Sequence, residues 1–122
     1  MSAQALFGLK VVEYGNFISA PYCTKLMADM GAEVIKIEEP GRGDESRDYG
    51  PFPDDIPHPE RSGLYLYLNT NKLGVTLNVR TRTGREIFGE LLKNADVIVE
   101  NNLPSLADEL GLSYSRIKEI NP

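Results

Sequence analysis

A strand–helix–strand pattern with short junctions, in the first third of the 122-residue chain, constrains the fold most. The β-prone run Val11–Tyr14 ends at Gly15, and apolar residues then recur at near-helical spacing over residues 20–30. The run Glu33–Glu38 follows after a few residues and is typical of a second strand. Two strands joined in this way are expected to lie parallel, with a right-handed crossover between them.

Residues that start and end helices agree with this pattern. Pro21 suits the first turn of the helix, and Gly31 follows Met30 where a left-handed C-terminal cap is expected. Thr83 and Glu86 have the spacing of a capping box, which predicts the start of another helix at this point.

The second half of the chain repeats the alternation. A third strand is predicted over 75–79 and a fourth over 95–100, with the helix after Thr83 between them. Two short helices, 104–110 and 113–120, are predicted in the tail. The expected fold class is therefore α/β, a Rossmann-like open parallel sheet with flanking helices. We expect one domain over 1–122, with an excursion or lid at about 39–70 that is dense in Pro, Gly and charge.

Composition excludes several classes of function. The net charge of −5 argues against nucleic-acid binding, because phosphate neutralisation requires a basic surface. No apolar run approaches a membrane span, and residues 1–10 lack the pattern of an export signal. Cys23 is the only cysteine and His58 the only histidine, so we expect no disulfide, no metal site and a reducing cytoplasm.

Ligands of open parallel sheets bind beyond the carboxyl ends of the strands. The candidate site therefore comprises residues 15–20, the segments that begin at Glu39 and Arg80, and residues 101–104. A dinucleotide fold needs three glycines after its first strand, whereas residues 15–20 contain one. This argues against NAD binding.

Several spaced motifs, which together cover almost the whole chain from Leu6, resemble the start of class III CoA-transferases. They are Gly8–Tyr14, Ala20-Pro21, Leu26–Glu38, Glu39–Asp44 with Arg47, Asn71-Lys72 before Val75–Leu77, Thr83–Glu86, Ala95–Asn101, Leu110–Tyr114 and Asn121-Pro122. This family includes formyl-CoA transferase, carnitine CoA-transferase and α-methylacyl-CoA racemase relatives.

The resemblance implies an enzyme that moves coenzyme A between carboxylic acids through an aspartyl intermediate, with coenzyme A or acyl-CoA as substrate and no permanently bound cofactor. It also implies a large domain built from both ends of the chain, an interlocked homodimer, and a catalytic aspartate beyond residue 122, so that this chain alone would be inactive. The implied coenzyme A contacts are Asn16, Phe17, Ile18, Ser19, Lys72, Asn101, Asn102 and Leu103. A racemase-like fragment and a noncatalytic nucleotide-binding or interaction domain remain alternatives.

The chemistry of coenzyme A adds two arginines to these candidates. Its phosphates require cations and its adenine an apolar wall, so Arg42 and Arg47 are interpreted as lid residues and Phe17 as core or adenine wall. Two departures from the family remove positive charge: Glu39 replaces a basic residue, and the turn at 101–105 lacks the usual arginine.

Two further residues are interpreted as nonfunctional. Cys23 is expected to be a small buried side chain of the first helix, and not a nucleophile. His58, which lies between two prolines, is expected to be exposed in a loop.

Overall fold

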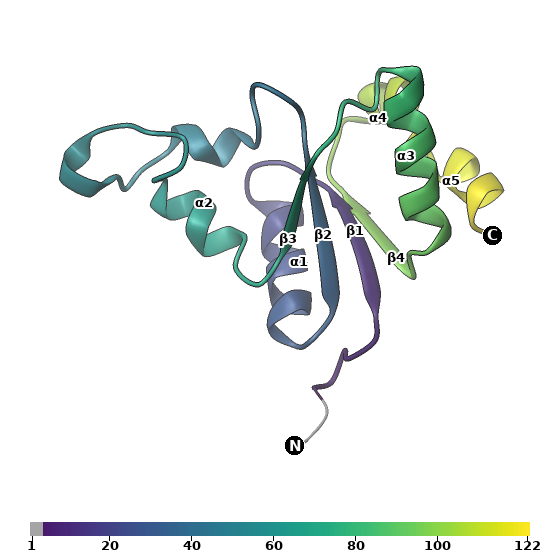
Figure 1. Cartoon of the computed structure of the whole chain (residues 1–122), viewed down its shortest axis with the longest axis horizontal. Coiled ribbons are helices and arrows are strands. Elements are labelled where there is room, and N and C mark those ends of the chain that lie inside the picture. The colour runs from purple at the N-terminus through teal and green to yellow at the C-terminus, as the bar shows by residue number, and fades with distance from the viewer. Residues whose placement is uncertain (1–3) are drawn as a thin grey trace.

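The computed structural model describes residues 4–122, so the first three residues of the stretch inspected for an export signal lie outside it. Its centre is a parallel sheet of β1 (Lys10–Tyr14), β2 (Glu33–Glu38), β3 (Leu73–Thr76) and β4 (Val97–Glu100), in the order β3-β2-β1-β4 (Figure 1). Val11 of β1 is in register with Val34 of β2 and Val97 of β4. The predicted open parallel α/β sheet is confirmed.

Alternation along the strands separates two apolar clusters. Val11 and Val34 contact Ala28 of helix α1 (Ser19–Asp29), whereas Val12 and Ile37 face the opposite way. On that other face they pack with helices α3 (Arg82–Lys93) and α4 (Pro104–Leu110), and α5 (Tyr114–Ile120) lies beside α3. Figure 1 shows α1 on one side of the sheet and α3, α4 and α5 on the other.

Helix α1 forms the predicted crossover between β1 and β2. Pro21 lies in its first turn, and Gly31 ends it with a φ of +101°, a left-handed conformation that favours glycine. Both predictions about this helix are confirmed.

The start of α3 corrects two predictions. The third strand is Leu73–Thr76, not 75–79: Leu77 and Val79 are buried in the core from a loop, which produced the strand-like alternation. The cap of α3 is Thr81, whose Oγ1 accepts a hydrogen bond from Gly84 N at 3.0 Å, so the helix begins before Thr83. A Cβ at Gly84 would lie 1.8 Å from Asn78 O, so this tight turn requires glycine.

The tail follows the prediction, with α4 and α5 separated by Gly111. After α5, Asn121 Nδ2 donates to Leu92 O and Ala95 O, both at 2.8 Å. Leu92 lies in the last turn of α3 and Ala95 directly follows its C-terminal cap, where carbonyls lack the regular helical partners. The Asn121 side chain therefore ties the tail to α3.

The 39–70 segment contains short 3-10 helices at Glu45–Asp48 and Pro53–Asp55 and helix α2 (Gly63–Leu68). It leaves the sheet on the same side as α1 (Figure 1). The hydroxyl of the buried Ser62 lies 2.7 Å from Ser46 O and 2.5 Å from Tyr49 O and shares its one proton between these carbonyls, which closes the segment into a loop. No helix in residues 4–122 has the length and apolar character needed to cross a membrane.

Candidate functional site

A hollow of about 360 Å³ lies at the carboxyl ends of the strands, where the sequence predicts a ligand site. We call it the carboxyl-edge hollow. Its lining comes from the ends of β1 and β2, the start of the 39–70 segment, the loop before α3, the turn after β4 and helix α4. The lining residues are Tyr14, Gly15, Asn16, Ile37, Glu38, Glu39, Arg42, Gly43, Asp44, Glu45, Arg80, Asn102, Leu106 and Leu110.

Asn101 joins the turn after β4 to the turn after β1. Its Nδ2 donates to Asn16 O at 2.8 Å and to Ser19 Oγ at 2.9 Å, and its Oδ1 accepts from Asn16 N at 2.9 Å. Asn102 Nδ2 donates to Tyr14 O at 3.2 Å. Four of the predicted contact residues, separated by more than 80 positions in sequence, are thus brought together at one edge of the sheet.

The apolar members of the predicted set lie outside the hollow lining. Phe17 has a φ of +66°, and its ring packs against Tyr49 with the centroids 4.9 Å apart. Ile18 and Leu103 are both exposed. None of these three side chains forms a wall of the hollow, so an adenine contact by Phe17 remains a prediction.

Two arginines supply the cations of the hollow. Arg42 is exposed, and no carboxylate in residues 4–122 lies within ion-pairing distance of it. Arg80 is paired with Glu109 of α4 at the protein surface. The sequence placed the segment beginning at Arg80 in the site but did not single out its side chain.

Lys72, by contrast, is a buried residue with a side chain only 2% exposed. Its Nζ donates to Glu13 Oε2 at 2.8 Å, Pro21 O at 2.9 Å and Asn69 Oδ1 at 2.8 Å, which uses all three ammonium protons. Burial lowers the pKa of Lys72, and Glu13 opposes that effect. A phosphate contact by Lys72 remains a prediction that requires it to leave these partners.

Lys72 belongs to a buried network of four charges that sequence reasoning missed. Glu13 Oε1 accepts from Lys36 Nζ at 2.8 Å, and Lys36 Nζ also lies 2.7 Å from Asp44 Oδ2. Thr24 Oγ1 donates to Glu13 Oε2 at 2.7 Å. The two lysines balance the two carboxylates, as buried charges require. The sequence did contain a signal for this network, because each of two neighbouring apolar strands carries a charged residue, Glu13 in one and Lys36 in the other.

A second ion pair fixes Glu38 at the rim of the hollow. Arg47 donates to both Glu38 oxygens at 2.9 Å, Tyr65 Oη donates to Oε1 at 2.6 Å, and Asp44 N donates to Oε2 at 2.7 Å. Burial raises the pKa of Glu38, but these hydrogen bonds outweigh it and hold the value at about 2. Arg47, predicted as a lid cation, therefore anchors the 39–70 segment and is not among the lining residues.

Two sequence interpretations outside the hollow have clear outcomes. Cys23 lies within α1 as predicted, but it is exposed, so the prediction of a buried side chain is wrong. It sits on the face of α1 that points away from the sheet. His58 is exposed in its loop, as predicted, and its Nδ1 accepts from Glu60 N at 3.1 Å.

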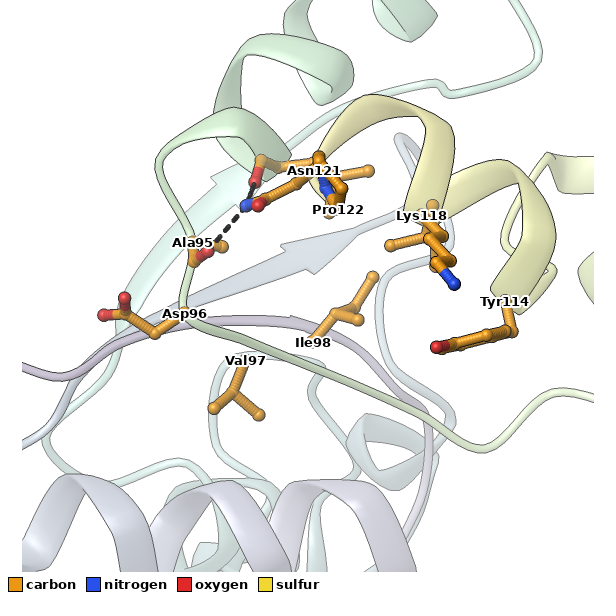
Figure 2. A pocket seen from close by; sticks show the side chains of 10 residues that line it. Ala95, Asp96, Val97, Ile98, Tyr114, Lys118, Asn121 and Pro122 are labelled. Carbon is orange, nitrogen blue, oxygen red and sulfur yellow. Dashed lines mark hydrogen bonds between the residues drawn. The ribbon is translucent and has the colours of Figure 1, made fainter.

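Another hollow, of about 290 Å³, lies between β4, the end of α3 and α5 (Figure 2). We call it the β4-side hollow. Figure 2 shows Val97 and Ile98 pointing to opposite sides of the strand and the Asn121 side chain turned toward Ala95. This hollow is away from the carboxyl ends of β1 and β2 and contains none of the predicted contact residues. Of these two hollows, the carboxyl-edge hollow is the one that coincides with the predicted site.

Comparisons with known proteins agree with these observations. Residues 6–122 match the family described as CoA-transferase family III. Formyl-CoA:oxalate CoA-transferase of Afipia carboxidovorans is 40% identical over 120 residues, 98% of this chain and 27% of that protein. Acetyl-CoA:oxalate CoA-transferase of Acetobacter aceti is 37% identical over 115 residues, 94% of this chain and 28% of that protein.

A solved structure gives the same result at the level of the fold. A CAIB/BAIF family protein from Brucella suis matches with a TM-score of 0.86 and 35% identity, over 99% of this chain and 32% of that one. The chain therefore spans about a quarter to a third of the length of these relatives.

Proposed function

The chain belongs to CoA-transferase family III, and from this premise we propose that it supplies the coenzyme A-binding part of an enzyme that moves coenzyme A between carboxylic acids. The observation that carries the proposal is the carboxyl-edge hollow, where Arg42 and Arg80 accompany the side-chain amides of Asn16 and Asn102. Coenzyme A offers phosphates for the guanidinium groups and an adenine whose edge amides can recognise.

The charges around the hollow decide where the phosphates would bind. Four carboxylates line it, but Lys36 neutralises Asp44 and Arg47 neutralises Glu38. Glu39 and Glu45 are left to oppose Arg42 and Arg80, and Arg80 is also paired with Glu109. We therefore place the phosphates at Arg42 and Arg80, with phosphate replacing Glu109 as the partner of Arg80.

The chemical step requires a group that we place outside this chain. An aspartate attacks the acyl-CoA thioester, forms a mixed anhydride and releases the coenzyme A thiolate. The thiolate then attacks the aspartyl carbonyl of the anhydride, which expels the donor acid as a carboxylate and leaves an aspartyl-CoA thioester. We take this aspartate to belong to the part of the relatives that the chain does not span. The role of the present residues is to bind and orient the nucleotide end of the substrate, which positions the thioester.

The same premise extends to the assembly. We propose that residues 1–122 are part of a larger Rossmann-like domain, that the complete enzyme is a cytoplasmic homodimer, and that its substrates are acyl-CoA and carboxylic acids. Both relatives described above carry oxalate in their names. A racemase-like activity would instead require a proton-transfer pair near the thioester, and a nucleotide-binding module would bind ATP as well as coenzyme A.

Calorimetric titration with coenzyme A tests the proposal. We expect Arg80→Gln to weaken binding by about tenfold, the effect of losing one charge-assisted phosphate contact. The matched control is Arg82→Gln, which changes an exposed arginine two residues away that pairs only with Glu86. Dephospho-coenzyme A and ATP are titrated in parallel. Equal affinities for the two variants, or tighter binding of ATP, would contradict the proposal.

A further inference from the structure

The turn after β1 has a backbone conformation that needs external support. Phe17 has a φ of +66°, in the left-handed region that an aromatic residue seldom adopts. The turn is also partly exposed and precedes the first residue of α1. Its conformation must therefore be fixed by contacts with neighbouring segments.

The Asp44 carboxylate makes the contacts that fix this turn. Its Oδ1 accepts hydrogen bonds from Phe17 N at 3.2 Å, Ser46 N at 2.8 Å and Ser46 Oγ at 2.6 Å. Its Oδ2 lies 2.7 Å from Nζ of Lys36, a buried residue of β2. One buried carboxylate thus joins the turn, the 39–70 segment and β2.

Two further hydrogen bonds keep Asp44 in this place. Its own N–H donates to Glu38 Oε2 at 2.7 Å, and Glu45 N donates to Asn16 Oδ1 at 2.8 Å. Because Lys36 is held in turn by Glu13, the orientation of Asp44 is set by the buried network and not by solvent.

We propose that Asp44 is the positioning residue of the coenzyme A-binding turn, holding Asn16 and Phe17 in their binding conformation before any ligand arrives. This inference rests on the proposed function only for the identity of the ligand. A preformed turn lowers the conformational cost of binding, so the contribution of Asp44 is to affinity, through residues that touch the ligand.

Two double variants distinguish the positioning role of Asp44 from its role in balancing the charge of Lys36. The first double variant combines Lys36→Met with Asp44→Asn, and the second combines Lys36→Met with Asp44→Ala. Each removes one charge of each sign and leaves the Glu13–Lys72 pair intact. Only the Asn side chain retains an oxygen that can accept from Phe17 N. The control is Asp48→Asn, which changes an exposed carboxylate in the 3-10 helix Glu45–Asp48 that Asp44 caps.

The readout is hydrogen exchange of the Phe17 amide, followed by NMR at equal folded fraction. We expect about fivefold faster exchange in the Ala double variant than in the Asn double variant, the factor for one neutral hydrogen bond. In the unsubstituted chain, the Phe17 amide should exchange more slowly than that of Ile18, which has no acceptor among the described residues. Equal exchange of Phe17 and Ile18 overturns the proposal even if a double variant fails to fold.

Coenzyme A titrations of the same proteins separate this proposal from the proposed function. If the turn loosens as expected but no protein binds coenzyme A, Asp44 still positions the turn and the assigned ligand is wrong. If coenzyme A binds the unsubstituted chain and both double variants equally well while exchange differs, positioning does not contribute to binding and the inference fails.

Discussion

Replacing Glu38 by Gln tests how the 39–70 segment is held to the sheet. The pKa of Glu38 falls from the ordinary 4.5 to about 2 because hydrogen bonds from Arg47, Tyr65 and the Asp44 N–H outweigh the effect of burial. At about 1.36 kcal/mol per pKa unit, this depression corresponds to roughly 3 kcal/mol. Because the pair retains some solvent contact, we expect about 1.5–2 kcal/mol to remain after screening.

Because the pKa of Glu38 is lower in the folded state than in the unfolded state, its ion pair stabilises the folded state more at higher pH. The stabilisation is fully present above the unfolded value of 4.5 and is lost as the pH falls from 4.5 to about 2. Urea unfolding at several pH values should therefore show that Glu38→Gln is less stable than the unsubstituted chain at pH 7, and that the difference shrinks across this window. Glu39→Gln, which changes the exposed neighbouring carboxylate, is the control. A difference independent of pH, or equal to that of the control, would show that the Glu38 ion pair does not hold the 39–70 segment to the sheet.

Three other predictions concern the surface, the tail and the chemistry. Apolar side chains recur every four residues on the outer face of α1, so the chain should self-associate in sedimentation experiments. Leu26→Lys should reduce this self-association more than Ile56→Lys, because Ile56 lies off that face. A monomer at all concentrations would contradict this prediction. Asn121→Ala should lower the free energy of unfolding by about 1–2 kcal/mol by removing the side-chain hydrogen bonds to Leu92 O and Ala95 O, whereas an unchanged midpoint in urea would show that water replaces the side chain. Incubation with labelled acyl-CoA followed by hydroxylamine or borohydride should trap no protein-bound adduct, and a reproducible adduct on one aspartate of this chain would show that the nucleophile is present.

The sheet and the clustering of loops at its carboxyl edge were predictable because they depend on local pattern. Val11–Tyr14 and Glu33–Glu38 are apolar runs separated by one helix length, and parallel strands place their following loops together. The third strand was displaced because Leu77 and Val79 alternate like a strand while packing from a loop. Periodicity reports burial, and it does not distinguish a paired strand from an extended loop over a core.

The roles of the charged side chains were not predictable in the same way. Lys72 was expected to contact coenzyme A and Arg47 to be a lid residue, but Lys72 is paired with Glu13, which is distant in sequence, and Arg47 with Glu38, nine positions away. The network around Glu13 depends on strand order, which places Glu13 beside Lys36, and the Arg47–Glu38 pair depends on the path of the 39–70 segment. Cys23 was expected to be buried because free cysteine is among the most buried residue types, and the side of α1 that faces the sheet could not be identified from spacing alone.

The most direct test of coenzyme A binding at the carboxyl edge is an NMR titration of the isotopically labelled chain with coenzyme A. We expect saturable amide shifts at Asn16, Gly43, Arg80 and Asn102, with the residues of the β4-side hollow unaffected. An absence of saturable shifts, or shifts confined to the β4-side hollow around Ala95 and Asn121, would contradict this expectation.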